Sequence, residues 1–421
     1  MKKLILISIL VLVFVPLSSA IAAEQLIFLS TQFNPVSEMQ FITEEVLSGF
    51  TNETGIKVEF VPVQYADFVN RILAEVKTGK VVTNVIAELH GGFDYLLSEN
   101  AIEDLSTMPE LPERTFLKTF DEYSEIRGVK AYIPWTQATF VVAINKEALE
   151  YLPEGLTQDD VLEGNPNWDY EALLRWGENL KEAKGAPMIG LAMAPGGLFH
   201  RFLHGYIYPS YTGSQAKDFA SQDAMDMWEY LIRLNEYIHP ASTTWSNMSE
   251  PLLKGEVLIG WDHAARLIQA LTTKPDDFVV APAPLGPKGR GYILVIAGLG
   301  MPKDAPNKED SWKLIEYLTR PSTQALILQG TGFFPVVEEA EKEITEGALK
   351  TLSDGVTKQA NAPLGIPCLI PSLGAFGGEF GNIYRMAFER IVLKGEDPNK
   401  VLPELNERLE EIFEEVDVPL Q

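Results

Sequence analysis

Aromatic and polar residues recur at the ends of several expected strands. His90 follows one apolar strand, Trp135 and Gln137 lie beside a second, and Trp261–His263 ends a third. In open α/β sheets, the connections at strand ends line the crevice that receives the ligand. Aromatic rings can stack on the apolar face of a pyranose, while amide and carboxylate groups can bond its hydroxyls. This mixture of side chains favours carbohydrate binding.

The candidate ligand contacts fall into two chemical groups. Stacking faces are expected from aromatic residues in connecting segments, namely Trp135, Trp261, Tyr208 and Phe376. Polar contacts are expected from Asp262, His90, Gln137 and Glu38, and a further aromatic loop contributes Phe333. An aromatic residue taken alone is found in a hydrophobic core more often than in a ligand site. Core packing is therefore the competing interpretation for each ring.

The sequence carries no signature of a catalytic or cofactor site. It has no P-loop, no Gly-x-Gly-x-x-Gly, no Gly-x-Ser-x-Gly elbow and no His-Glu-x-x-His. His200 and His204 are spaced for one face of a metal site, but the sequence implies no third ligand near them. We expect no catalytic residue, no metal and no cofactor. A secreted glycosidase stays open as an alternative, because carboxylates are abundant and a suitable pair would suffice.

The charge balance narrows the possible partners. The chain has 59 acidic and 34 basic residues, a net charge of −25 at pH 7. This charge argues against nucleic acid and anionic lipid headgroups as partners. It also disfavours a free anion as ligand, unless the fold builds a local basic pocket. Cys368 is the only cysteine, so no intrachain disulfide can form.

The N-terminus has the pattern of a secretory signal. Met1–Lys3 is positively charged, Leu4–Val15 is apolar except for Ser8, and small residues follow. The apolar run is shorter than the roughly 20 residues of an ordinary membrane span. We therefore predict a signal peptide at 1–22 and a folded body outside the cytoplasmic membrane, periplasmic or at the cell surface. A retained N-terminal anchor is the alternative.

Strand and helix patterns alternate along the rest of the chain. Strands are expected at 25–30, 56–60 and 82–88, separated by stripes of apolar residues at helical spacing. This order predicts a parallel sheet with helices on its faces. Similar alternation returns after residue 132 with no low-complexity linker between the two parts. We therefore expect two α/β domains between which the chain crosses more than once.

A series of short motifs in one order resembles a known family. It includes Thr54–Val58 (TGIKV), Gly128–Pro134 (GVKAYIP), Asn167–Glu171 (NWDYE), Leu253–Val257 (LKGEV) and Gly332–Val336 (GFFPV). Together they resemble the extracellular solute-binding proteins of ABC importers, in the sugar-binding branch that includes maltose-binding protein. The resemblance covers essentially the whole chain after the signal segment.

The resemblance implies two lobes joined by about three crossings, with the ligand between them. One lobe would comprise residues 23–137 plus 283–331, and the other 138–282 plus 332–421. Such a protein would be a monomer that closes on a sugar, with an oligosaccharide as the expected form, and delivers it unchanged to membrane permease subunits. A polyamine or peptide binder of the same fold, and a sensor subunit, stay open.

The sequence departs from the family's maltose binder at contact positions. Ala138 stands where that protein has an acidic residue, and Ala265 aligns roughly with its stacking tryptophan. The segment around Glu88–His90 lacks the family's Trp-x-x-Asp-Arg cluster. These differences argue against maltose itself as the ligand, and Trp261 is the alternative stacking ring.

Overall fold

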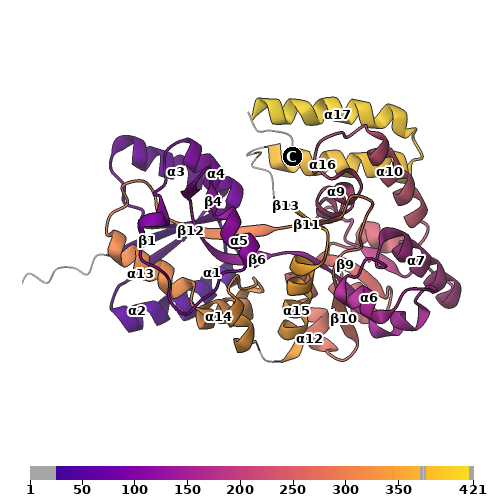
Figure 1. The fold of residues 1–421 in the computed structure, drawn as a ribbon, viewed down its shortest axis with the longest axis horizontal. Helices are drawn as coiled ribbons and strands as arrows, with labels where there is room; N and C mark the ends of the chain where they lie inside the picture. The colour runs from indigo at the N-terminus through magenta and orange to yellow at the C-terminus, as the bar shows by residue number, and fades with distance from the viewer. Residues whose placement is uncertain (1–24, 345, 370–372, 374–375, 417–421) are drawn as a thin grey trace, which may run out of the picture.

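The computed structural model describes residues 25–344, 346–369, 373 and 376–416. The predicted signal segment at 1–22 lies outside the described residues. Figure 1 shows two lobes side by side, each built on a sheet with helices packed around it. The predicted two-lobed α/β fold is thereby confirmed.

The sheet of the first lobe has the strand order β2-β1-β3-β12-β6. Its strands are β1 (Leu26–Ser30), β2 (Val58–Pro62), β3 (Val85–Leu89), β6 (Ile133–Ala138) and β12 (Val295–Gly300). β1 runs parallel to β2 and β3, whereas β12 is antiparallel to both β3 and β6. The late strand β12 is thus inserted between two strands from the first third of the chain.

The sheet of the second lobe has the order β10-β7-β9-β8. Its strands are β7 (Phe140–Asn145), β8 (Ile189–Leu191), β9 (Ile259–His263) and β10 (Phe278–Ala281). Two short ribbons complete the described strands: β11 (Arg290–Ile293) with β13 (Gly365–Cys368), and β4 (Glu125–Ile126) with β5 (Val129–Lys130).

Helices cover both sheets (Figure 1). The helices of the first lobe are α1 (Val36–Phe41), α2 (Ser48–Thr54), α3 (Tyr65–Thr78), α4 (His90–Ser98), α5 (Lys118–Tyr123), α13 (Lys308–Leu318) and α14 (Pro321–Thr331). Those of the second lobe are α6 (Gln158–Glu163), α7 (Tyr170–Lys184), α8 (Phe199–Phe202), α9 (Tyr208–Thr212), α10 (Gln222–Leu234), α11 (Ser249–Lys254), α12 (Ala264–Thr273), α15 (Gly347–Asn361), α16 (Gly377–Ala387) and α17 (Pro398–Glu415).

Shorter helical turns continue or connect these elements. Wider π-helical turns occur at Ile42–Leu47, Leu203–Ile207 and Phe388–Leu393. Tighter 3₁₀ turns occur at Leu105–Thr107, Lys146–Tyr151, Pro240–Thr244 and Glu338–Glu343.

The ends of α7 follow from its sequence. The Asp169 side chain accepts a hydrogen bond from the backbone N–H of Ala172 at 2.6 Å and so caps the first turn. Gly185 ends the helix in the left-handed conformation at φ 75°, which glycine adopts without a steric penalty. Between these ends Trp176 and Leu180 face the core with no exposed surface. The helix therefore begins at Tyr170, directly after its cap.

The chain passes between the lobes at three places that lie against one another. We call residues 137–139, 293–295 and 333–335 the crossing region. Gln137 and Phe334 exchange two backbone hydrogen bonds of 2.9 Å. The Thr139 hydroxyl donates to the carbonyl oxygen of Ile293 at 3.0 Å. Because all three passes are bonded together, they form one small connection between two large bodies.

The second pass lies later in the chain than the expected boundary at residue 283. Arg290 is fully buried and donates to the carbonyl oxygens of Ala283 and Gly164, the latter at 2.6 Å. The backbone N–H of Gly291 donates to the Ser210 hydroxyl at 2.8 Å. Residues 283–293 therefore pack with the second lobe, because the buried guanidinium finds its acceptors there. The chain returns to the first sheet only at Val295.

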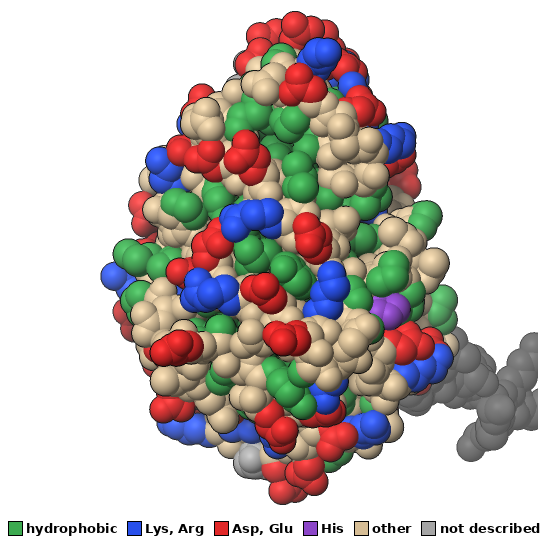
Figure 2. All heavy atoms as spheres, turned by 90° about the vertical axis from the view of Figure 1, so that its right-hand side faces the viewer, with side chains coloured by type: hydrophobic (Ala, Val, Ile, Leu, Met, Phe, Trp, Pro, Cys, Tyr) green, Lys and Arg blue, Asp and Glu red, His purple; other side chains and the backbone are tan. Residues whose placement is uncertain are grey.

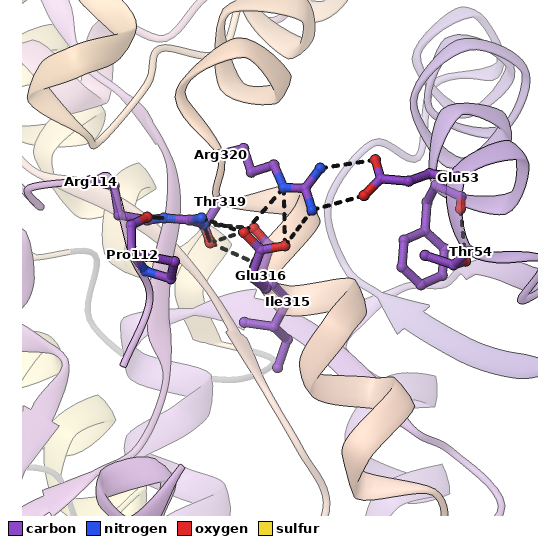
Figure 3. A network of polar contacts seen from close by, with 9 residues as sticks. Glu53, Thr54, Pro112, Arg114, Ile315, Glu316, Thr319 and Arg320 are labelled. Carbon is purple, nitrogen blue, oxygen red and sulfur yellow. Dashed lines mark hydrogen bonds and ion pairs between the residues drawn. The ribbon is translucent and has the colours of Figure 1, made fainter. Parts of the chain in front are cut away.

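A charged network ties together distant parts of the first lobe (Figure 3). The Glu316 carboxylate pairs with Arg114 at 2.5 Å and with Arg320 at 2.7 Å. Arg320 in turn makes two bonds to Glu53, at 2.9 and 3.0 Å. Burial alone would raise the pKa of Glu316, but the hydrogen bonds from Arg320 and Arg114 hold it below its ordinary value. The network joins α2, the 112–114 segment and α13.

The outer face of the second lobe carries acidic and basic side chains interspersed with small apolar areas (Figure 2). Such a mixed surface is typical of a protein that stays in solution. Over the described ranges, none of the helices combines the length and the apolar character needed to cross a bilayer.

Candidate functional site

The strand pairing determines which loops of the two lobes face each other. Leu89 at the end of β3 pairs with Ala297, near the point where β12 leaves the crossing region. His263 at the end of β9 pairs with Phe140, the first residue after the crossing. β1 runs parallel to β3 and β8 parallel to β9. The loops after Ser30 and Leu89, and those after Leu191 and His263, therefore lie toward the crossing region; we call them the facing edges.

Trp261 belongs to an aromatic cluster beneath the facing edge of the second lobe. Its ring stacks on Phe140 with centroids 4.6 Å apart and planes 6° apart. Tyr206 and Phe202 meet it edge-on at 4.8 and 5.2 Å. The side chain is only 5% exposed, and its buried Nε1 finds no hydrogen-bond partner in the described part of the chain. This ring therefore packs as core, and the ligand contact expected from the sequence stays a prediction.

Asp262 turns its carboxylate toward the backbone rather than toward solvent. It accepts hydrogen bonds from the N–H groups of Met248 at 2.9 Å and His263 at 2.8 Å. Burial raises the pKa of Asp262 to about 6 despite these bonds and the charge of Arg266. The side chain has no exposed surface, so it organises the loop rather than presenting free oxygens.

Two further predicted rings are fully buried. Trp135 on β6 lies between Phe28 and Phe33, with centroids 5.6 and 5.2 Å away. Tyr208 donates from its hydroxyl to the carbonyl oxygen of Lys217 at 2.6 Å and is 0% exposed. Neither ring offers a stacking face in this arrangement. Both were expected in loops, but Trp135 lies in β6 and Tyr208 lies in α9, where neighbouring side chains cover them.

The facing edge of the first lobe carries buried groups able to bond hydroxyls. His90 Nδ1 lies 3.0 Å from the Tyr132 hydroxyl, and burial lowers the pKa of His90. Glu88 is 3% exposed, and its Oε1 accepts from the N–H of Leu89 at 2.6 Å. Its Oε2 is buried with no hydrogen-bond partner among the described residues. Burial raises the pKa of Glu88 to about 7, although the Leu89 N–H and the nearby Thr31 side chain act to lower it.

Glu88 was not among the predicted contacts. The signal in the sequence was an acidic residue inside an otherwise apolar strand, two residues before the expected contact His90. An unpartnered carboxylate oxygen costs free energy when buried, so such a group usually awaits a donor.

Of the remaining predicted residues, two lie in the crossing region and two at the starts of helices. Phe333 is half-buried and meets Phe33 edge-on at 5.1 Å. Gln137 donates from Nε2 to the carbonyl oxygen of Pro335 at 2.8 Å and so holds two passes together. Glu38, in the first turn of α1, is half-buried, and burial raises its pKa. Phe376 is half-buried at the start of α16.

The facing edge of the second lobe holds an unexpected concentration of basic side chains. We call Arg201, Arg266, Arg385, His200 and His263 the basic cluster. All five side chains are half-buried rather than exposed. They come from α8, α12, α16 and the end of β9. The sequence did not predict a basic site from these residues, because they come from four elements that converge only in the folded chain.

Two arginines of the cluster hold the loop after β8. Arg385 donates to the carbonyl oxygens of Gly197 at 2.5 Å and Met193 at 3.3 Å. Arg266 donates to those of Ser246 at 2.8 Å and Gly196 at 3.3 Å. These bonds fix the two guanidinium groups in place on either side of the loop.

The histidines of the cluster are held neutral. Burial, with the positive charges of Arg201, Arg385 and Arg266, lowers the pKa of His200 to about 3. Burial and the charges of Arg266 and Arg201 lower that of His263 to about 4. A neutral imidazole offers one N–H donor and one acceptor.

A surface hollow of about 750 Å³ adjoins the basic cluster. Its walls include the 195–200 loop, the α16 residues Asn382 and Arg385, and Phe388. The His200 and His204 rings have centroids 5.8 Å apart. In the part of the chain that the structure describes, no three His, Cys, Asp or Glu side chains gather as metal ligands.

Comparison with known proteins places this arrangement in a family. Residues 34–325 match the model of the bacterial extracellular solute-binding proteins. This match spans more than half of the chain, and the protein belongs to that family. A search of the curated proteins finds no match to the sequence.

Solved structures share the fold over nearly the whole chain. The sugar-binding protein MalE from Xanthomonas citri matches with a TM-score of 0.73 and 16% identity, covering 93% of this chain and 98% of that one. Maltose-bound MalE3 of T. maritima gives 0.67 and 17%, covering 92% and 99%. UgpB from Mycobacterium tuberculosis, in complex with glycerophosphocholine, gives 0.65 and 17%, covering 94% and 99%.

Proposed function

We propose that this protein captures a carbohydrate between its lobes and delivers it, chemically unchanged, to the membrane subunits of an ABC importer. The observation that carries the proposal is the crossing region, which joins two lobes whose polar facing edges meet on either side of it. Solved relatives of this fold are described as binding maltose and glycerophosphocholine. The fold therefore supports a binder of small hydroxylated molecules.

The proposed mechanism is a change in the population of two arrangements. A ligand that contacts both lobes only when they are close together stabilises that arrangement by its differential affinity. Three bonded passes at one place suit hinge motion, because few residues need to change conformation. No bond in the ligand has to form or break in this cycle.

Specific groups of the first lobe would receive the ligand's hydroxyls. The Oε2 of Glu88 would accept a hydroxyl hydrogen bond, and His90 lies two residues further along the chain. Satisfying a buried carboxylate oxygen in this way contributes more than bonding an exposed one, because no water is displaced from it on binding.

Calorimetric titration of the purified protein with mono-, di- and oligosaccharides tests the proposal. We expect one sugar to bind, to decrease the radius of gyration in solution scattering, and to be recovered intact by mass spectrometry. Glu88→Gln should weaken binding roughly tenfold or more, whereas the exposed control Glu182→Gln on α7 should not. Steady release of reducing ends would instead indicate a glycosidase, and scattering unchanged by every sugar would contradict the proposal.

A further inference from the structure

We propose that the sugar derivative bound by this protein carries an anionic oxygen group, a phosphate ester or a carboxylate, that is recognised by Arg201 of the basic cluster. This inference rests on the proposed function and names the class of its substrate. It concerns the facing edge of the second lobe, where the positively charged arginines of the basic cluster lie.

The first argument is the lack of compensating charge. The protein has a net charge of −25, and arginines elsewhere, such as Arg114, Arg320 and Arg408, pair with carboxylates. Within the described residues, Arg201 and Arg266 form no ion pair with any carboxylate. Where acids outnumber bases so strongly, unpaired arginines at one edge are a specific feature rather than an average one.

Asp262, the acid that acts on Arg266, does not neutralise the cluster. Asp262 uses its two oxygens on the N–H groups of Met248 and His263. It is fully buried, and burial favours its protonated form as described above. Asp262 therefore does not balance the positive charge of the cluster, which an anionic group of the ligand would balance.

The second argument is the position of Arg201. It lies in α8, directly after the loop that follows β8, and its charge acts on His200, His204 and His263 together. Its guanidinium makes no side-chain hydrogen bond to any residue in the described part of the chain. A half-buried guanidinium has lost part of its hydration without gaining protein partners, so an anion would replace both.

The third argument is the geometry of its surroundings. Arg266 and Arg385 are already fixed by the carbonyl oxygens of the 193–197 loop and Ser246. Arg201, the group without such bonds, keeps its planar fork of donors for a ligand. This fork matches phosphate and carboxylate oxygens in a bidentate arrangement, which a neutral hydroxyl cannot offer. Neutral His200 and His263 can add one N–H donor each without further charge repulsion.

Calorimetry with matched ligand pairs tests the inference. The probes are glucose and maltose, glucose 1-phosphate and glycerol 3-phosphate, a glucuronic acid disaccharide, and inorganic phosphate. We expect an anionic sugar derivative to bind roughly 10- to 100-fold more tightly than its neutral parent, the range of charged hydrogen bonds. The phosphate and uronate arms distinguish the two sources of the oxyanion.

Variants assign the effect to Arg201. Arg201→Gln should remove the preference for the anionic ligand, and Arg201→Lys should retain part of it because charge stays but the fork is lost. The control Arg175→Gln, at an exposed position on α7, should leave all affinities unchanged. If Arg201→Gln does not fold, as judged by circular dichroism, the Arg201→Lys comparison carries the test.

The outcomes separate the two proposals. Tight binding of a neutral sugar, equal in the wild type and Arg201→Gln, overturns the anionic ligand and keeps the proposed function. Binding of inorganic phosphate as tight as that of every sugar phosphate, and sensitive to Arg201→Gln, overturns the sugar and keeps the oxyanion site.

Discussion

The buried side chain of Gln137 donates a hydrogen bond of 2.8 Å from its Nε2 to the carbonyl oxygen of Pro335. The bond joins the first and third passes of the chain between the lobes, beside the paired backbones of residues 137 and 334. A side chain expected to contact ligand is therefore used to hold the crossing region together. This changes what its substitution should do.

Gln137→Ala should lower the free energy of unfolding by about 1–3 kcal/mol, because it leaves a buried carbonyl oxygen without its donor. Urea denaturation measures this, with the exposed Gln222→Ala on α10 as control. A variant of unchanged stability that loses ligand affinity would instead identify Gln137 as a binding residue.

Trp261→Ala should destabilise the second lobe by about 3–5 kcal/mol, since it removes a large ring from a packed aromatic cluster. Trp261→Phe should cost less, because it keeps a stacking partner for Phe140 and removes an unpartnered indole N–H. Thermal melts followed by near-ultraviolet circular dichroism compare the two. A normal melt with lost sugar affinity in the alanine variant would show that the ring contacts ligand.

Glu316→Gln should cost about 1–3 kcal/mol at pH 7, because Arg114, whose side chain is 3% exposed, loses its carboxylate partner. The folded-state pKa of Glu316 is depressed, so its contribution is present above the unfolded value of 4.5 and is lost as pH falls below it. The stability difference between wild type and variant should shrink on acidification.

The control for that experiment is Glu309→Gln, whose side chain is 88% exposed in its pair with Lys313. An exposed pair of this kind contributes little to stability. Equal effects of the two substitutions would contradict a stabilising role for the network in Figure 3.

Glu88 should make stability depend on pH in the opposite sense. Its pKa is raised from 4.5 to about 7 in the folded protein, so its favourable contribution is present below pH 4.5 and is lost as pH rises toward 7. Glu88→Gln should therefore gain on the wild type by up to about 3 kcal/mol between these limits. Parallel pH profiles of the two proteins would contradict a buried, protonated Glu88.

The sequence predicted the elements better than their assembly. Short apolar runs located β1 and β2 to within about two residues, because strand-forming residues lie together in the local sequence. The insertion of β12 between β3 and β6 joins segments far apart in the chain, and no local pattern encodes it. The boundary at residue 283 was misjudged for the same reason, since the acceptors of Arg290 become neighbours only after folding.

The position in the fold of some candidate residues was predictable, whereas their contact with a ligand stays a prediction. The segments around His90, Trp261 and Phe376 do lie at or beside the facing edges. Which side chains present free groups could not be read from residue type, because Trp135 and Trp261 are buried by neighbours from other elements. The basic cluster could not be predicted from the sequence, because Arg201, Arg266 and Arg385 lie on different helices far apart in the chain.

The placement of β12 also sets an order of events during folding. The first sheet cannot be completed until residue 300 has been synthesised, because β12 supplies the only partner through which β3 and β6 are joined in the described sheet. Closing so long a loop is slow compared with forming local helices. β3 and β6 therefore lack this shared partner until the greater part of the polypeptide has been made.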